Sequence, residues 1–140
     1  MARLNPLDEA VELMFYGHRG IIREADDYLS QFGMAQAHLR MMYILARYDG
    51  ITIGELVAAL GISKQAAQRP MRTLIGGGFV SVSRDPGRHR FKVLHLTQRG
   101  SEVEREATEL KRALLEQAFA GCAADAEAWT RVMRTIAENA

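Results

Sequence analysis

Apolar side chains recur every three or four residues along the first third of the chain, a spacing that predicts amphipathic helices. The first predicted helix runs from Pro6 to about Leu29, and the break at Gln31–Gly33 ends it. Its apolar face carries Leu7, Val11, Met14, His18, Ile21, Ala25 and Leu29. A second helix is predicted from about Ala35 to Tyr48, with Leu39, Met42, Leu45 and Ala46 facing inward.

The next pattern is two short helices with almost no loop between them. Thr52 and Glu55 form a capping box, in which each side chain satisfies a backbone donor at a helix start. That helix ends at Leu60, because Gly61 suits a left-handed terminating residue and Ser63 can cap the next helix at once. The second helix is predicted over about 64–75. This arrangement is typical of a helix-turn-helix.

Glycines at 76–78 end that helix, and the pattern then changes to the alternation of strands. Residues 79–83 and 92–96 are predicted to form a hairpin that turns at Asp85-Pro86-Gly87. Arg88, His89 and Arg90 would make its tip basic. A hairpin that directly follows a helix-turn-helix defines a winged helix.

Two more helices are predicted at the end of the chain. Thr97 can cap a helix running to about Phe119, and a last helix from about Ala124 carries Trp129, Val132, Met133 and Ile136 at helical spacing. The first and last helices have apolar stripes without an obvious partner, which indicates an interface in a homodimer. The alternative is a monomer in which both helices fold back onto the winged helix.

The expected fold class is therefore mainly α with a small β hairpin, in one domain spanning residues 1–140. Residues 33–100 would form the winged helix-turn-helix, and residues 1–30 and 101–140 the helical dimerisation region. A chain of this length can bury a core of its own, and 48% hydrophobic residues with only three prolines indicate an ordered protein.

Charge is concentrated in the winged helix. Residues 61–100 carry eight Lys or Arg and one acid, a net charge of +7, whereas the segments before and after them each carry five bases and eight acids. A basic face of this kind indicates a polyanion partner, and with a groove-sized helix and a basic hairpin it favours double-stranded DNA. The open alternative is a winged-helix adaptor that binds protein and has no sequence-specific DNA binding.

Nine residues are the predicted DNA contacts. Gln65, Gln68 and Arg69 are assigned to base edges, Lys64, Arg72 and Arg84 to phosphates, and Arg88 and Arg90 to the minor groove. Ser63, the cap of the same helix, completes the set.

Other classes of protein find little support. No segment approaches the roughly 20 apolar residues of a membrane span, so we expect a cytoplasmic protein without a membrane partner. A glycine-rich phosphate loop, GxSxG and HExxH are all missing from the sequence, so we expect neither an enzyme nor a cofactor. The four histidines lack metal-site spacing, and Cys122, among small neighbours, is expected to pack as a small hydrophobe.

The order and spacing of several short motifs resemble the multiple antibiotic resistance regulator (MarR) family along essentially the whole chain. They are Thr52–Leu56, Leu60–Ser63, Gln68-Arg69, Leu74 with Gly78–Val80, Arg84–Arg90 and Leu96–Gly100. The resemblance implies a homodimeric transcription regulator, usually a repressor, that binds a palindromic operator. It also implies release from DNA by a small aromatic effector bound between the dimer helices and the winged helix.

Aromatic ligands favour apolar walls with a few polar groups. On that basis Met14, His18, His38 and Met42 are the predicted effector-pocket residues. The chain also departs from the family in two ways. Arg88 stands where the wing usually has an acid, and Pro70 lies inside the recognition helix, where we expect a kink or a rearranged first turn.

Overall fold

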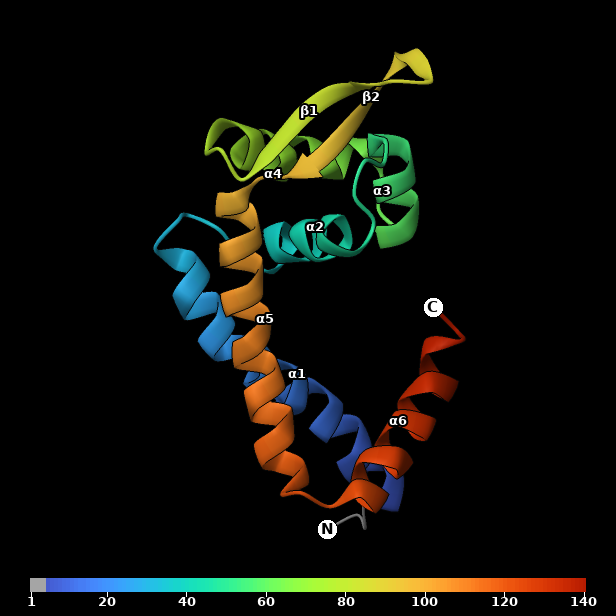
Figure 1. Ribbon diagram of the computed structural model, residues 1–140. Coiled ribbons are helices and arrows are strands. Elements are labelled where there is room, and N and C mark those ends of the chain that lie inside the picture. The colour runs from blue at the N-terminus through green and yellow to red at the C-terminus, as the bar shows by residue number, and fades with distance from the viewer. Residues whose placement is uncertain (1–4) are drawn as a thin grey trace.

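The computed structural model describes residues 5–140, apart from the side chain of His89, so residues 1–4 of the predicted helical region lie outside it. The elements follow in the order α1 (Pro6–Ser30), α2 (Gln36–Arg47), α3 (Ile53–Leu60), α4 (Lys64–Gly76), β1 (Val80–Asp85), β2 (Arg88–Leu96), α5 (Gln98–Phe119) and α6 (Ala123–Ala137). In Figure 1, α2, α3, α4 and the hairpin form a compact head. Helices α1 and α5 run away from it side by side, and α6 turns back at the far end. The predicted fold class is confirmed.

Local side chains set the helix starts as the sequence predicted. The Thr52 hydroxyl accepts a hydrogen bond from the Glu55 amide at 3.1 Å, and the Glu55 carboxylate accepts one in return. The Ser63 and Thr97 hydroxyls cap α4 and α5 by accepting hydrogen bonds from the Ala66 and Gly100 amides, without a reciprocal carboxylate. Gly61 adopts φ +67°, the left-handed conformation that a side chain disfavours. The turn between α3 and α4 is therefore the turn of a helix-turn-helix.

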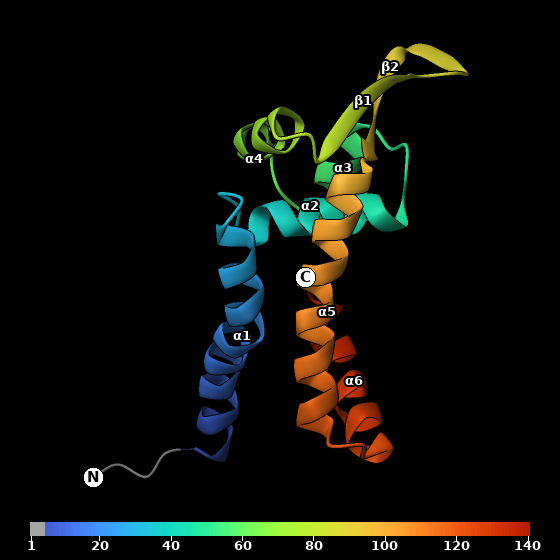
Figure 2. The ribbon, with the colours of Figure 1, turned by 60° about the vertical axis from the view of Figure 1, so that its left-hand side comes forward.

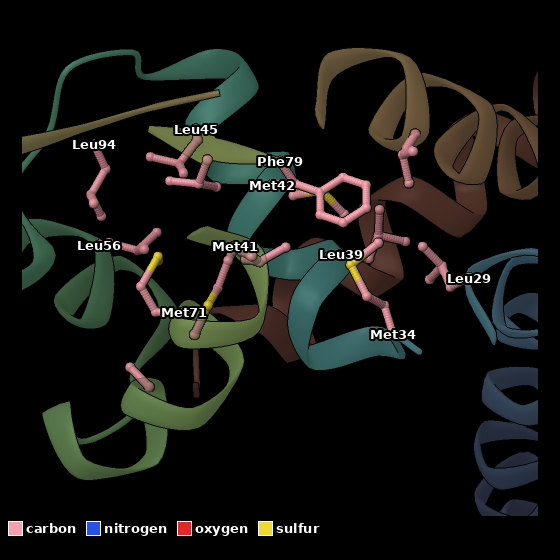
Figure 3. Packing of buried hydrophobic residues seen from close by; sticks show 14 of the residues in the cluster. Leu29, Met34, Leu39, Met41, Met42, Leu45, Leu56, Met71, Phe79 and Leu94 are labelled. Atoms are coloured by element: carbon pink, nitrogen blue, oxygen red, sulfur yellow. The ribbon is translucent and has the colours of Figure 1, made fainter. Parts of the chain in front are cut away.

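The head has a closely packed apolar core built around α2. Figure 3 shows Leu39, Met42 and Leu45 of α2 meeting side chains from α3, α4 and the hairpin. Met41 is also buried, whereas Ala46 is exposed, so the prediction that Ala46 faces inward was wrong. Helix α2 is contacted by α3 and α4 as well as by α5. A helix that is packed on several sides buries a wider face than a single row of apolar residues at helical spacing predicts.

The hairpin pairs β1 with β2 antiparallel, from Val80 opposite Leu96 to Arg84 opposite Lys92. The register then shifts, so that Asp85 pairs with Arg88 and the chain turns at Pro86 and Gly87. Arg88–Arg90 therefore belong to β2, which corrects their predicted place at the tip. Val82 is exposed because the hairpin projects beyond the helices, as Figure 2 shows.

Several contacts attach the long helices to the head, and three of them are the following. Phe32, after α1, meets the ring of Phe79 edge-on at 5.8 Å. Arg47 of α2 forms an ion pair with the buried Glu104 of α5. At the start of α5, Gly100 lies so close to the Phe79 carbonyl that a Cβ would come within 2.1 Å of that oxygen. The head and the upper parts of α1 and α5 therefore form one packed unit.

The parts of α1 and α5 that lie away from the head, together with α6, lack such a core. We call α1, α5 and α6 the lower helices. Of the predicted apolar face of α1, Ala25 and Leu29 are buried, but Leu7 is 70% exposed and Val11 56%. Every residue of α6 is at least partly exposed, including Trp129 at 45%. These apolar faces lie open in the single chain.

Candidate nucleic-acid interface

One face of α4 is polar and open, and the other is anchored in the core. Ala67, Met71 and Leu74 are buried and hold the helix against α2 and α3. The exposed side carries all five predicted contacts of this helix, Lys64, Gln65, Gln68, Arg69 and Arg72. Long side chains that donate hydrogen bonds can reach base edges and phosphates from such a face.

Ser63 has a structural role at the start of this helix. Its hydroxyl accepts a hydrogen bond from the Ala66 amide at 3.0 Å, and the residue is exposed. A capping serine of this kind holds the first turn, and its hydroxyl retains a proton that it can donate to a phosphate.

Helix α4 continues through Pro70 and ends at Gly76. Its first turn is capped regularly by Ser63, so the structure does not bear out a rearranged first turn. Pro70 has no amide proton, which leaves the Ala66 carbonyl without its usual intrahelical donor. A bend of the helix at this point stays a prediction.

The wing presents arginines around an exposed aromatic ring. The guanidinium carbons of Arg88 and Arg90 lie 5.0 and 5.2 Å from the ring centre of Phe91, within cation–π range. Arg88 also forms an ion pair with Asp85 at 3.3 Å. The wing therefore has an ion pair although Arg88 replaces the expected acid.

Asp85 holds the tight turn of the wing. Its carboxylate accepts a hydrogen bond from the Gly87 amide at 2.9 Å. This backbone bond, together with Arg88, lowers the pKa of Asp85 below its ordinary value. The carboxylate is therefore ionised near neutral pH and keeps Arg88 at the edge of the hairpin.

The end of α4 is fastened to the start of α5. Arg99 donates a hydrogen bond to the Gly77 carbonyl at 2.6 Å, and its guanidinium lies 4.3 Å from the ring centre of Phe79. Thr97 donates to the Gly78 carbonyl at 2.6 Å. These bonds couple the orientation of the candidate recognition helix to the long helix α5. Arg99 is thus directed at the protein backbone, although it contributes to the basic segment.

A second set of contacts, which the sequence pattern did not reveal, lies at the base of the wing. Ser83 Oγ lies 2.8 Å from His95 Nε2, and His95 Nδ1 lies 3.1 Å from Asp49 Oδ1. We call Ser83, His95 and Asp49 the wing brace. Its members come from both strands and from the loop after α2, and no local spacing connects Asp49 with the other two.

The four predicted effector residues fall into two separate places. Met14 and His18 line an apolar groove of about 560 Å³ between α1, α5 and α6, together with Trp129 and Met133. Met42 is instead fully buried in the core of the head. His38 caps α2, where its Nδ1 accepts a hydrogen bond from the Ala35 amide at 3.0 Å. These four residues do not form one pocket.

A smaller cavity of about 170 Å³ lies where the head meets α5. It is lined by Leu39, Arg40, Tyr43, Ile44, Leu60, Thr108 and Lys111. The Thr108 hydroxyl is buried and has no hydrogen-bond partner among the described residues. Burial lowers the pKa of Lys111, and the neighbouring Arg40 adds to this effect. The cavity therefore combines apolar walls with an unsatisfied hydroxyl and two cationic groups.

Among the side chains that the structure describes, a set that leaves out His89, no group of three or more His, Cys, Asp or Glu is arranged to hold a metal ion. Within residues 5–140, no helix has the length and hydrophobicity needed to cross a membrane. Cys122 is exposed, so the prediction that it packs as a small buried hydrophobe was wrong.

Comparison with known proteins places this geometry in a family. Residues 32–90 match the profile of the MarR family. Over 115 residues, the chain is 36% identical to the HTH-type transcriptional regulator PetP of Rhodobacter capsulatus. That alignment covers 81% of this chain and 68% of the relative.

Solved structures share the fold at lower sequence identity. A MarR protein from Peptoclostridium difficile has a TM-score of 0.80 at 18% identity, covering 99% of this chain and 92% of that one. A mutant of S. aureus MepR bound to an oligodeoxyribonucleotide has a TM-score of 0.65 at 15% identity, covering 94% and 98%. The likeness to these structures establishes the fold, and the identity with PetP establishes the relationship. The chain belongs to the MarR family of DNA-binding winged helix-turn-helix transcription regulators.

Proposed function

We propose that this regulator acts as a homodimeric repressor that binds a palindromic operator and is released by a small aromatic anion. The observation that carries the proposal is the exposed polar face of α4, which presents Gln65, Gln68 and Arg69 beside Lys64 and Arg72. Amide and guanidinium groups read base edges, and the cations neutralise phosphates. Arg84, Arg88 and Arg90 of the wing add a second contact with the DNA backbone and the minor groove.

The open apolar faces of α1 and α6 support the proposed dimer. Large side chains such as Leu7, Phe15 and Val132 are more than half exposed in the single chain. Apolar surface of this extent is typical of an interface. In a two-fold dimer the same patch meets itself, so residues 1–30 and 101–140 form the dimerisation region. Two symmetric recognition helices then fit half-sites about one helical turn apart.

The effector site is assigned to the small cavity between α2, α3 and α5. The larger groove around Met14 and His18 is formed by the same apolar helices that a second subunit would cover. A cavity of about 150 Å³ accommodates a benzene ring, so about 170 Å³ suits one ring. A carboxylate on that ring could pair with Arg40 and Lys111, and a hydroxyl could bond Thr108 Oγ1. Occupancy would displace α5 relative to the head and so change the spacing of the recognition helices.

The test is selection of bound duplexes from a random DNA pool, followed by titration of the enriched duplex at several salt concentrations. An inverted repeat with a steep salt dependence supports the proposal, because phosphate contacts release counterions. Salt-sensitive binding without an enriched motif would contradict sequence-specific reading. No binding at any salt concentration would favour the protein adaptor.

Benzoate, salicylate and a neutral benzyl alcohol then serve as probes of release. We expect the two anions to weaken operator binding and the alcohol to leave it unchanged. Lys111→Gln should abolish the response while the protein still binds the operator without ligand. Equal release by all three compounds would contradict the proposal that Arg40 and Lys111 bind the carboxylate of the effector.

A further inference from the structure

Two backbone hydrogen bonds hold the base of the wing to the body of the protein. The Gly50 amide donates to the Leu94 carbonyl at 3.0 Å, and the Leu94 amide donates to the Ile51 carbonyl at 2.7 Å. From Ser81 to Arg84 every residue of β1 is exposed, as are Arg90, Phe91 and Lys92 of β2. The angle at which the arginines meet DNA therefore depends on a small number of contacts near Leu94.

The wing brace adds side-chain bonds at this point. His95 is paired across the hairpin with Ser81, so its ring lies on the face that carries Ser83 and turns toward the loop after α2. Asp49 accepts only, so Nδ1 of the neutral ring carries the proton and Nε2 accepts from the Ser83 hydroxyl. Gly50, next to Asp49, adopts φ +75°, a backbone conformation that favours glycine, and a Cβ there would lie in ordinary contact with His95 Cε1 at 3.5 Å. The brace thus links β1 to the body through β2.

Serine, histidine and aspartate in this order also form the catalytic triad of many hydrolases. That chemistry requires donors preorganised around a reacting carbonyl in a water-excluded site. Ser83 is exposed, and the side chains of His95 and Asp49 are 33% and 69% exposed. A positioning role accounts for these open contacts without a substrate site.

We propose that Ser83, His95 and Asp49 are positioning residues that set the angle of the wing relative to the recognition helix and thereby strengthen DNA binding. Ser83 directly precedes Arg84, where the register of the hairpin shifts, so the brace acts one residue from the first wing cation. The inference rests on the proposed contact between the wing and DNA. The three residues themselves need no contact with DNA.

The test compares His95→Ala with the parent protein on the duplex enriched by selection. We expect affinity to fall about fivefold to tenfold, as for the loss of one or two hydrogen bonds. The preferred sequence should stay the same, since α4 is untouched. Ser81→Ala, on the same face but outside the brace, is the matched control and should bind like the parent. Binding by His95→Ala that equals the parent's would overturn the proposal.

The effect of His95→Ala is also measured in a variant without two of the wing arginines, which tests whether the brace acts through the contact between the wing and DNA. In a variant carrying Arg88→Ala and Arg90→Ala, Arg84 is the one proposed wing contact that the brace can still position, so adding His95→Ala should lower affinity by clearly less than the fivefold expected in the parent background. A full fivefold loss in that background would overturn the brace and indicate an effect on α4. If Arg88→Ala with Arg90→Ala binds like the parent, the proposed wing contact fails, and the brace fails with it.

Asp49→Ala and Asp49→Asn test the brace independently of His95→Ala, in case that variant does not fold. Asp49 is exposed on a loop, so neither change should lower the melting temperature much. Asn keeps an acceptor oxygen for His95 and should restore most of the affinity that Ala loses. Amide hydrogen exchange at residues 88–92 of the free protein should accelerate in Asp49→Ala, while exchange in α4 stays unchanged. Equal exchange in the Ala variant and the parent would contradict a role in holding the wing.

Discussion

The head and the lower helices of this protein are built from similar apolar residues but use them differently. Leu56 and Leu74 are fully buried inside the head, whereas Leu7 and Trp129 lie open on α1 and α6. The head encloses its own core and needs no partner to do so. The lower helices leave their apolar faces uncovered in the single chain, which supports the proposal that a second subunit packs against them.

Charge separates the same two regions. The basic segment 61–100 belongs to the head, and the segments on either side carry more acids than bases. The phosphate backbone repels a negatively charged surface, so the excess of acids in residues 1–30 and 101–140 disfavours contact between the lower helices and DNA. The division of charge therefore supports the head as the DNA-binding part and the lower helices as the assembling part.

The largest expected effect comes from placing a charge on the open face of α6. Val132→Glu should destabilise the dimer by more than about 6 kcal/mol, because an unpaired buried charge costs roughly 3–5 kcal/mol and a two-fold interface contains it twice. Sedimentation equilibrium should then detect a monomer at micromolar concentration. Thr135→Glu, an exposed polar position on the same helix, is the control and should leave the dimer intact. A dimeric Val132→Glu protein would contradict the proposed interface.

A core substitution in the head should act on folding. Leu56→Ala removes a fully buried side chain and should lower the free energy of unfolding by about 2–5 kcal/mol. Val82→Ala, at a position that is 42% exposed on the wing, should change it by about 0.5 kcal/mol or less. Urea unfolding measures both variants. Equal losses would show that the head lacks the separate core assigned to it.

Base reading should depend on the exposed face of α4. Arg69→Ala should cost about 1–3 kcal/mol of operator affinity and relax the sequence preference at the position it reads. Arg112→Ala, an exposed arginine on α5, removes the same charge from the lower helices. The affinities of the Arg69→Ala and Arg112→Ala proteins for single-base variants of the operator show which arginine affects the sequence preference. An Arg69→Ala protein with unchanged preference would remove this residue from the base contacts.

A smaller effect is expected at the wing. Arg90→Ala should weaken binding about equally for all sequences and reduce the slope of log affinity against log salt by about 1. Fluorescence anisotropy at four salt concentrations measures the slope. A changed base preference with an unchanged slope would contradict a contact with the DNA backbone and would assign Arg90 to base reading.

The smallest effect concerns His38, where the pH dependence of stability can be derived. Burial lowers the pKa of His38 below its ordinary value of 6.5. At a pH between the pKa of His38 in the unfolded chain and its lower pKa in the folded protein, the unfolded chain binds more protons. The free energy of unfolding therefore decreases as the pH falls through 6.5 toward the folded-state pKa. His38→Asn removes this loss and keeps an acceptor for the Ala35 amide. Thermal melts between about pH 7 and about pH 5 should show a shallower decline in the variant.

Local chemistry explains which features could be predicted from the sequence. Thr52, Ser63 and Thr97 each bond an amide three residues further along the chain, so the sequence alone could predict these caps. The open face of α4 follows from helical spacing. The register shift of the hairpin and the burial of Met41 depend on tertiary packing, which no local pattern reports. The wing brace joins residues 46 positions apart in sequence, and for that reason the sequence did not reveal it.

The same distinction explains the effector residues. Met14 and His18 share a face of α1 and meet in one groove. His38 and Met42 share a face of α2, but that face points into the head. Apolar spacing identifies a face and does not say what covers it, so the four could not be sorted before the helices were placed in space.

The central claim is that two copies of this chain read two half-sites of one DNA molecule. Native mass spectrometry of the protein on its selected duplex tests it most directly, with affinity measured in parallel on a duplex in which one half-site is scrambled. We expect two 15.6 kDa chains per duplex and an affinity at least about tenfold lower after scrambling. One chain per duplex, or equal affinity for both duplexes, would contradict the claim.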